Sequence, residues 1–415
     1  MTCTRKLLVV AALLAVCVAA RSPAQDVFLP SAVEAARLDL GGGNYLRAID
    51  SLKSAAHPAD GKAGDPISEQ LWEQFSPFVT NELPPAAYDT AGADDMLGAG
   101  WSDRISRASS RDALAEIVRR ARTTRIVILN EAHNSPRDRA FALEVARALR
   151  PLGYSVLAVE AIRNYPVTGE PLSGAERLRQ DGFARLNTGD YTRDPVFAGF
   201  LRGAMALGYE PVAYEETKQQ MKPGGGTAAR EMAQADNLFD SVFSGRPKVK
   251  TLIYVGLSHA AEAPVNGTDR MAGILKRLTK VDPLTIDQAT VTDLTPETRR
   301  AYDLASAKIG KRSGILFDRG KPLVLGPYEG AVDLQVIHPR RAYRLGRPNW
   351  LAALGGRPVS IPKNPRPAAG RRLVQVFAAN APGDAVPLDQ VMVTAGGAVP
   401  ALFAPAVPLR FQSQQ

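Results

Sequence analysis

Residues 126–133 read Ile-Val-Ile-Leu-Asn-Glu-Ala-His, a run of branched apolar side chains that ends in polar ones. Pro136 follows at a position typical of the first turn of a helix. Phe141, Val145 and Leu149 then recur at helical spacing. A short apolar strand followed at once by a helix is the unit from which helix-covered parallel sheets are built. This stretch therefore predicts an α/β fold.

The same alternation continues along the chain. Further short apolar runs, which we interpret as buried strands, occupy residues 156–159, 211–214, 252–255 and 284–286. Helical patterns lie between them, at about 173–184, 194–207, 227–243 and 268–280. The sequence predicts an α/β domain over residues 109–295, with a mainly parallel sheet covered by helices on both faces.

The flanking regions have a different character. Residues 25–108 predict a helical and irregular N-terminal region, with a helical hairpin at 29–57 broken at Gly41-Gly42-Gly43. After residue 295, short strand-like runs at 314–317, 334–337 and 373–377 are separated by Gly and Pro. Residues 296–415 therefore predict a smaller β-rich C-terminal region.

The first residues resemble an export signal. Arg5 and Lys6 precede an apolar run over residues 7–20, and small residues offer cleavage near residue 20 or 24. We expect residues 1–24 to be a signal peptide and the mature protein to be secreted or periplasmic in a bacterium. An uncleaved anchor helix and lipid attachment at Cys17 are the alternatives. The run is shorter than the roughly 20 residues that span a membrane, and no other segment reaches that length.

The two cysteines, Cys3 and Cys17, both lie within this expected signal peptide. A chain cleaved after residue 24 would therefore have neither disulfides nor thiolate ligands. Any metal site in it would have to use His, Asp, Glu and other oxygen donors.

Positive charge is concentrated in one stretch. Residues 338–372 hold nine Lys and Arg and no Asp or Glu, which matches the net charge of +9 of the whole chain. We expect an exposed loop surface or ion pairs to the main domain; binding to an anionic envelope polymer or substrate is the alternative. Six prolines, few aromatic residues and the expected export argue against a nucleic-acid partner.

Polar residues follow four of the predicted strands. Glu131 and His133 follow the first, Glu160 the second, Glu215 the third and His259 the fourth. In parallel sheets these strand ends share one edge, where ligands bind, so the sequence predicts one crevice that contains them all. Two of the chain's four histidines fall here. Taken singly, each could be an ordinary loop histidine or a helix-capping carboxylate.

Three motifs in this order resemble a known superfamily. They are Asn130-Glu131-Ala132-His133, Arg230-Glu231-Met232-Ala233 and Gly256-Leu257-Ser258-His259. They are similar to the Gly-Glu-x-His opening, the Arg-containing helix and the second Gly-x-x-His motif of the superfamily of erythromycin esterases, ChaN-type haem-binding proteins and TIKI/TraB proteins. The resemblance covers roughly residues 109–290, and Asn130 stands where the first motif usually has Gly. It implies a site that contains Glu131, His133, Glu160 and His259, with Glu215 and Arg230.

The branches of that superfamily differ in their chemistry. Esterase-like members imply a histidine general base oriented by carboxylates. TIKI-like members imply a divalent metal, for which His133, His259 and Glu131 would be the ligands. ChaN-like members imply haem, which needs an axial His or Tyr and an apolar slot. Tyr165 and Tyr191 are in loops near the predicted crevice.

The residues favour hydrolysis by water. A Glu-x-His pair makes an imidazole more basic, and the α/β region lacks a Gly-x-Ser-x-Gly nucleophile motif. We expect an exported hydrolase of an ester or amide bond, with or without a metal, acting on a small-molecule or peptide substrate. The alternatives are a periplasmic haem- or metal-binding protein of ChaN type without catalysis and a purely structural domain.

Overall fold

The computed structural model describes residues 31–88, 92–167, 169–221 and 223–415. The expected signal peptide, residues 1–24, lies outside the described residues. Within the described ranges, none of the helices combines the length and the apolar character needed to cross a lipid bilayer.

The centre of the molecule is a nine-stranded sheet in the order β1-β7-β9-β6-β2-β5-β3-β4, with β8 paired to β7. Its strands are β1 (Ser109–Asp112), β2 (Ile126–Glu131), β3 (Tyr154–Val159), β4 (Glu210–Ala213), β5 (Lys250–Gly256), β6 (Leu284–Asp287), β7 (Gly314–Asp318), β8 (Lys321–Pro322) and β9 (Leu334–Ile337). Strands β2, β3, β4, β5, β6 and β9 run parallel, whereas β7 is antiparallel to β1, β8 and β9. The predicted α/β class is confirmed, and the sheet is mixed.

The sheet extends beyond the residues from which we predicted it. β7 and β9 follow residue 295, in the region that we expected to be C-terminal and β-rich, yet both pair within the main sheet. β1 lies at the very start of the domain that we predicted over residues 109–295, before the first strand that we predicted. The sequence of a short apolar run does not show which sheet the strand joins, because its pairing partner is set by contacts distant in sequence.

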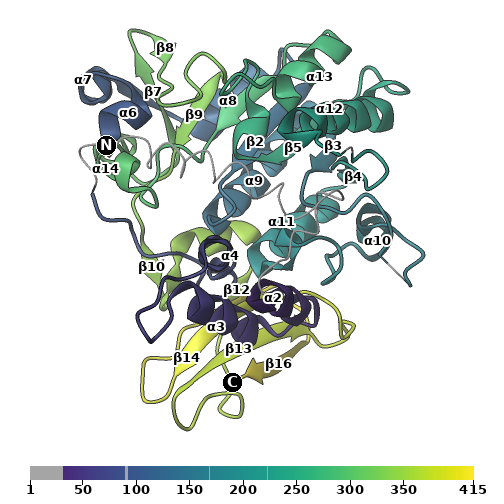
Figure 1. Ribbon diagram of the computed structural model, residues 1–415, viewed down its shortest axis with the longest axis vertical. Helices are drawn as coiled ribbons and strands as arrows, with labels where there is room; N and C mark the ends of the chain where they lie inside the picture. The colour runs from purple at the N-terminus through teal and green to yellow at the C-terminus, as the bar shows by residue number, and fades with distance from the viewer. Residues whose placement is uncertain (1–30, 89–91, 168, 222) are drawn as a thin grey trace.

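Helices cover both faces of the sheet (Figure 1). Val127 and Leu129 of β2 pack into one core cluster, and Ile126 and Ile128 pack into another on the opposite face, as the alternation of a strand requires. The first face is covered by α8 (Ala113–Ala121), α9 (Pro136–Leu149) and α11 (Pro195–Ala206), and the second by α12 (Gly226–Leu238) and α13 (Met271–Thr279). Helices α6 (Ala93–Leu97), α7 (Trp101–Arg107) and α14 (Pro296–Ile309) pack beside β7, and α10 (Gly174–Asp181) contacts β4.

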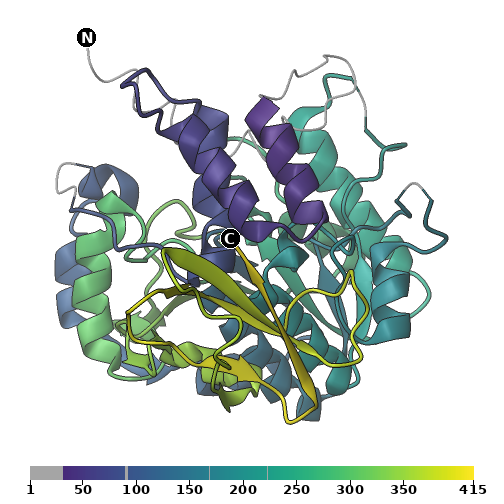
Figure 2. The same cartoon turned by 90° about the horizontal axis from the view of Figure 1, so that it is seen from below.

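The two ends of the described chain lie against each other. Figure 2 shows the N-terminal helices beside the C-terminal sheet. The helices are α2 (Ser31–Gly41), α3 (Tyr45–Ala56), α4 (Pro66–Phe75) and α5 (Pro77–Thr80). The C-terminal region has β10 (Tyr343–Arg344), β11 (Arg347–Pro348), β12 (Arg357–Val359), β13 (Arg371–Ala378), β14 (Asp389–Thr394), β15 (Leu402–Ala404) and β16 (Leu409–Gln414). Gln414 bonds the backbone of Gly43 and Leu46, so β16 holds the turn between α2 and α3.

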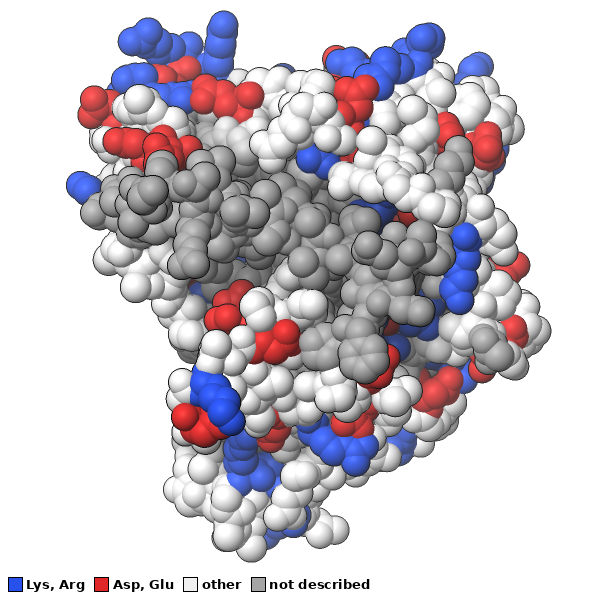
Figure 3. Space-filling view, in the orientation of Figure 1, with Lys and Arg blue, Asp and Glu red and all other residues white. Residues whose placement is uncertain are grey.

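The basic stretch forms several ion pairs. Arg347 is buried and binds Asp389 through two hydrogen bonds of 2.7 and 2.9 Å. Arg341 pairs with Asp293 at 2.6 Å, and Arg371 pairs with Asp50 at 2.7 Å. Figure 3 shows Lys and Arg beside Asp and Glu over the visible face. The pairs of Arg341 and Arg371 join the C-terminal region to the rest of the molecule, whereas Arg347 and Asp389 both belong to that region.

Candidate functional site

A pocket of about 180 Å³ opens at the carboxyl ends of β2, β3, β4 and β5. Of the six residues singled out from the sequence, five line it: Glu131, His133, Glu160, Glu215 and Arg230. His259, the sixth, is buried and contacts Arg230 and Glu160. The structure thus brings together all six, and the neighbouring positions of these four strands in the sheet explain why.

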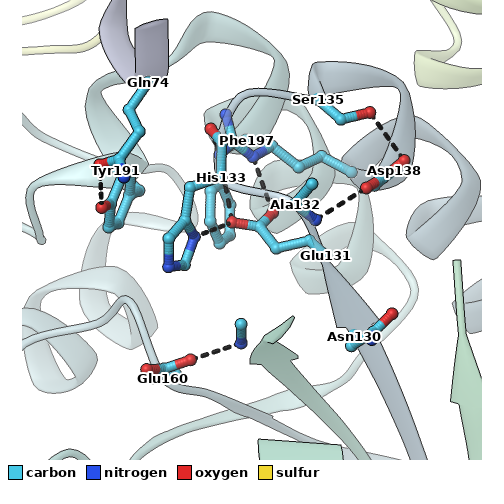
Figure 4. Close-up of polar contacts among 12 residues, drawn as sticks. Gln74, Asn130, Glu131, Ala132, His133, Ser135, Asp138, Glu160, Tyr191 and Phe197 are labelled. Carbon is cyan, nitrogen blue, oxygen red and sulfur yellow. Dashed lines mark hydrogen bonds and ion pairs between the residues drawn. The ribbon is translucent and has the colours of Figure 1, made fainter. Parts of the chain in front are cut away.

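Glu131 and His133 form a hydrogen-bonded pair (Figure 4). Nδ1 of His133 lies 3.0 Å from Oε1 of Glu131. The carboxylate of Glu131 also accepts hydrogen bonds from Nε of Arg139, at 2.8 Å, and from the hydroxyl of Tyr254, at 2.9 Å. Arg139 is fully buried and pairs in turn with Asp194 at 2.7 Å. The carboxylate behind the imidazole is therefore held in one orientation.

These contacts determine which nitrogen of His133 carries the proton. Burial would raise the pKa of Glu131, but the charges of Arg139 and His133 outweigh it and lower that pKa. An ionised carboxylate only accepts hydrogen bonds, so Nδ1 of His133 must donate. In the neutral ring Nε2 is then the basic nitrogen. That edge of the ring lies beside Glu160 and Gly256 (Figure 4).

Tyr191 fixes the plane of the imidazole. Its ring stacks on that of His133 with a centroid separation of 4.2 Å and an interplanar angle of 16°. Its hydroxyl donates a 2.7 Å hydrogen bond to Oε1 of Gln74, in α4. The side chain of His133 is only 11% exposed. The N-terminal helices thus hold, through Gln74, the ring that stacks on His133.

Arg230 joins the other carboxylates of the pocket. Its Nη2 donates to Glu160 and to Glu215, each at 2.5 Å, and its Nε donates to Glu215 at 2.9 Å. Glu160 also accepts the backbone N–H of Gly256 at 2.5 Å. Burial opposes ionisation of Glu160, but the nearby charges of His259, Arg230 and His133 lower its pKa to about 2. Glu160 is therefore a fixed negative charge at neutral pH.

His259 has a carboxylate partner of its own. Its Nδ1 lies 2.8 Å from Oε2 of Glu231, which is fully buried and is bound by Arg270 at 2.9 Å. Burial would lower the pKa of His259, but the carboxylates of Glu231 and Glu160 raise it. Nη1 of Arg230 lies 2.9 Å from Nε2 of His259. Since an Arg only donates, Nε2 accepts this bond when the ring is neutral.

Both histidines therefore share one arrangement: an imidazole, a buried carboxylate at its Nδ1 and a buried Arg behind the carboxylate. Sequence reasoning found the histidines and Glu131. It assigned no role to Arg139, Asp194, Glu231, Arg270, Tyr254 or Gly256. The sequence did contain a signal for Glu231, which directly follows Arg230 in one of the three motifs. Adjacent residues of a helix face different directions, so the two side chains contact different groups.

The donor set does not fit the expected metal site. Both oxygens of Glu131 are bonded to protein groups, and this carboxylate lies behind His133. A cation at Nε2 of His259 would meet the positive charge of Arg230. Within the described ranges, no group of three or more His, Cys, Asp or Glu could hold a metal ion. Haem requires an apolar slot, whereas charged side chains line this pocket beside apolar ones.

Comparison with known proteins finds likeness only among solved structures. No family model and no curated protein matches the chain. RRSP, an effector domain of a MARTX toxin from Vibrio vulnificus, is 15% identical, with a TM-score of 0.32 over 61% of this chain and 55% of that one. Two structures described as bacterial protein toxins are 16% and 15% identical, with TM-scores of 0.31 and 0.34. They are matched over 62% and 61% of this chain. The chain spans 55% to 57% of the length of these three structures.

Proposed function

We propose that the protein is an exported hydrolase that uses water to cleave an ester or amide bond. The observation that carries this proposal is the pair formed by His133 and Glu131, with Nδ1 of the imidazole 3.0 Å from the carboxylate and its Nε2 edge beside the pocket. A histidine held this way acts as a general base. The resemblance of the three motifs to erythromycin esterases supports the same reading.

The proposed reaction assigns one step to each group. Nε2 of His133 removes a proton from water as the water oxygen bonds to the substrate carbonyl carbon. The protonated ring is stabilised by Glu131 and then gives the proton to the leaving alkoxide or amine as the bond to carbon breaks. Arg230 supplies positive charge near the developing oxyanion, since the second N–H of its Nη1 has no protein acceptor among the described residues.

Export is the second part of the proposal, and it rests on the signal-like residues 1–24. The intact mass of protein recovered from the periplasm or medium of a bacterial host tests it. Loss of residues 1–20 or 1–24 supports export with cleavage. A recovered chain that retains Cys17 contradicts it.

The hydrolase is tested on a panel of para-nitrophenyl esters, anilides and dipeptides. We expect His133→Gln to lower kcat/KM for the best substrate by about a hundredfold or more, the usual contribution of a general base. His57→Gln is the matched control, because His57 is exposed and packs on Trp72 in the N-terminal region, outside the pocket. Equal activity of the two variants would contradict the proposal.

A further inference from the structure

Three arginines gather at one part of the pocket, in addition to the groups of the proposed reaction. Arg37 comes from α2, Arg163 from the loop after β3, and Arg193 from the turn of 3-10 helix Tyr191–Arg193. All three line the same pocket as His133. They come from segments far apart in sequence, so their meeting is a property of the fold.

Arg163 and Arg193 share the carboxylate of Asp190. Nη2 of Arg163 lies 2.7 Å from Oδ1 of Asp190, and Nη1 of Arg193 lies 3.3 Å from the same oxygen. Arg37 has no ion-pair partner among the described residues. Glu131, Glu160 and Glu215 are already bound by Arg139 or Arg230. This part of the pocket therefore carries an excess of positive charge.

Arg193 is built into the protein rather than lying on its surface. Its side chain is 7% exposed, its Nε donates a 2.8 Å hydrogen bond to the carbonyl of Leu186, and its own carbonyl accepts from Tyr45. Burial lowers the pKa of Arg193, and the nearby positive charges of Arg163 and Arg37 lower it further. The negative charge of Asp190 acts in the opposite direction. Binding of an anion stabilises a buried cation that has two like charges nearby.

We propose that these three arginines form a subsite for an anionic group of the substrate, so that the preferred substrate is an ester or amide whose acyl portion ends in a carboxylate. Arginine suits this role because its planar N–H groups match the two oxygens of a carboxylate. The neighbouring His133 places the bond to be cleaved in the same pocket. This inference rests on the proposed hydrolase for its substrate class, and on the arginines alone for binding of the anion.

The test compares two esters of similar size, mono-para-nitrophenyl glutarate, which is anionic, and para-nitrophenyl butyrate, which is neutral. We expect the full chain to prefer the glutarate ester, chiefly through a lower KM, and Arg37→Gln to reduce that preference about tenfold, the effect of one charge-assisted hydrogen bond. Arg37→Lys should restore part of it. Arg344→Gln is the matched control, because Arg344 is exposed on β10, outside the pocket, and the preference should not change.

Calorimetric titration with glutarate separates the subsite from the reaction. Binding that Arg37→Gln weakens about tenfold supports the subsite even if neither ester is cleaved, in which case the hydrolase proposal fails alone. If both esters are cleaved with the same ratio by the unaltered chain and by Arg37→Gln, and glutarate binds both alike or neither, the subsite is overturned while the hydrolase stands.

Discussion

At the scale of single residues, Gly256 is a position where the site leaves no room for a side chain. A Cβ at this residue would lie 2.6 Å from Cε1 of His133 and 3.2 Å from Oε2 of Glu160. The backbone of Gly256, with φ −83°, is ordinary for any residue, so the constraint comes from the neighbouring imidazole and carboxylate. Glycine there lets the histidine sit directly against the strand end.

We therefore expect Gly256→Ala to displace the imidazole of His133 and to lower kcat/KM about a hundredfold, the cost of a misplacement of about 1 Å. Gly245→Ala is the matched control, since a Cβ at Gly245 meets nothing within 4 Å. Both variants should be compared by steady-state kinetics and thermal melting. Unaltered kinetics for Gly256→Ala would show that the histidine does not act from this position.

Asp138 gives the molecule a distinct dependence of stability on pH. Burial raises the pKa of this carboxyl to about 8, although the N–H of Ala132 and the hydroxyl of Ser135 favour its ionised form. In the unfolded chain its pKa is about 3.9. Because the folded state holds the proton more tightly, the contribution of Asp138 to stability is fully present below about pH 4 and is lost as pH rises through about 8.

Asp138→Asn removes this titration and keeps an oxygen that can accept from Ala132. We expect the free energy of unfolding of the unaltered chain, minus that of Asp138→Asn, to fall by roughly 1.4 kcal/mol per pH unit between about pH 4 and 8. Urea unfolding of both proteins over this range measures the difference, in which other titrating groups largely cancel. A difference that does not vary with pH would refute the assignment.

At the scale of elements, the sequence was informative where a residue with an ionisable side chain directly follows a strand. Glu131, Glu160 and Glu215 could be predicted to meet, because each follows an apolar run whose carboxyl end shares one edge of the sheet. Arg139 could not, since a buried Arg on a helix looks in the sequence like any charged residue of an amphipathic pattern. Arg270, also buried, directly precedes α13 and looks like an ordinary charged loop residue. The strand orientations of β1 and β7 were missed because pairing depends on distant residues.

The packing of β16 against the α2–α3 turn makes a prediction at this scale. Gln414 accepts from the N–H of Leu46 at 3.1 Å, donates to the carbonyl of Gly43 at 2.5 Å and contacts Gln375 at 3.0 Å. We expect Gln414→Ala to lower the free energy of unfolding by about 1 to 3 kcal/mol, because it leaves partly buried backbone groups unpaired. Chemical denaturation measures this loss.

Gln412→Ala, on the same strand, is the matched control. Gln412 is exposed, and substitutions at such positions change stability by about 0.5 kcal/mol or less. Equal destabilisation by the two variants would mean that the bonds from Gln414 to the turn do not hold the N-terminal helices.

At the scale of the whole molecule, the pocket is assembled from parts that lie far apart in sequence. Gln74 and Arg37 come from the N-terminal helices, and Tyr191 and Arg193 come from the segment before α11. Of the reacting groups, His133 follows β2 and Arg230 lies on α12. The N-terminal helices thus form one wall of the site. A single sequence does not show this, because the hydrophobic pattern of a helix gives its buried face but not its partner.

The basic stretch at residues 338–372 has a structural role at this scale. Arg341 with Asp293 connects the C-terminal region to the rest of the chain, and the buried Arg347 pairs with Asp389 within that region. A buried charge pair of this kind is costly to break from one side, by about 3 to 5 kcal/mol. Part of the positive charge in this stretch is therefore committed to holding the molecule together.

The central claim is that Glu131 holds the neutral His133 with its proton on Nδ1 and its basic Nε2 toward the pocket. Nitrogen NMR of the chain labelled with ¹⁵N-histidine tests it directly, since the four histidines give few signals and His133→Gln identifies the relevant pair. We predict a protonated Nδ1 and an unprotonated Nε2 for neutral His133, and loss of this preference in Glu131→Gln. A neutral ring with its proton on Nε2 would contradict the account.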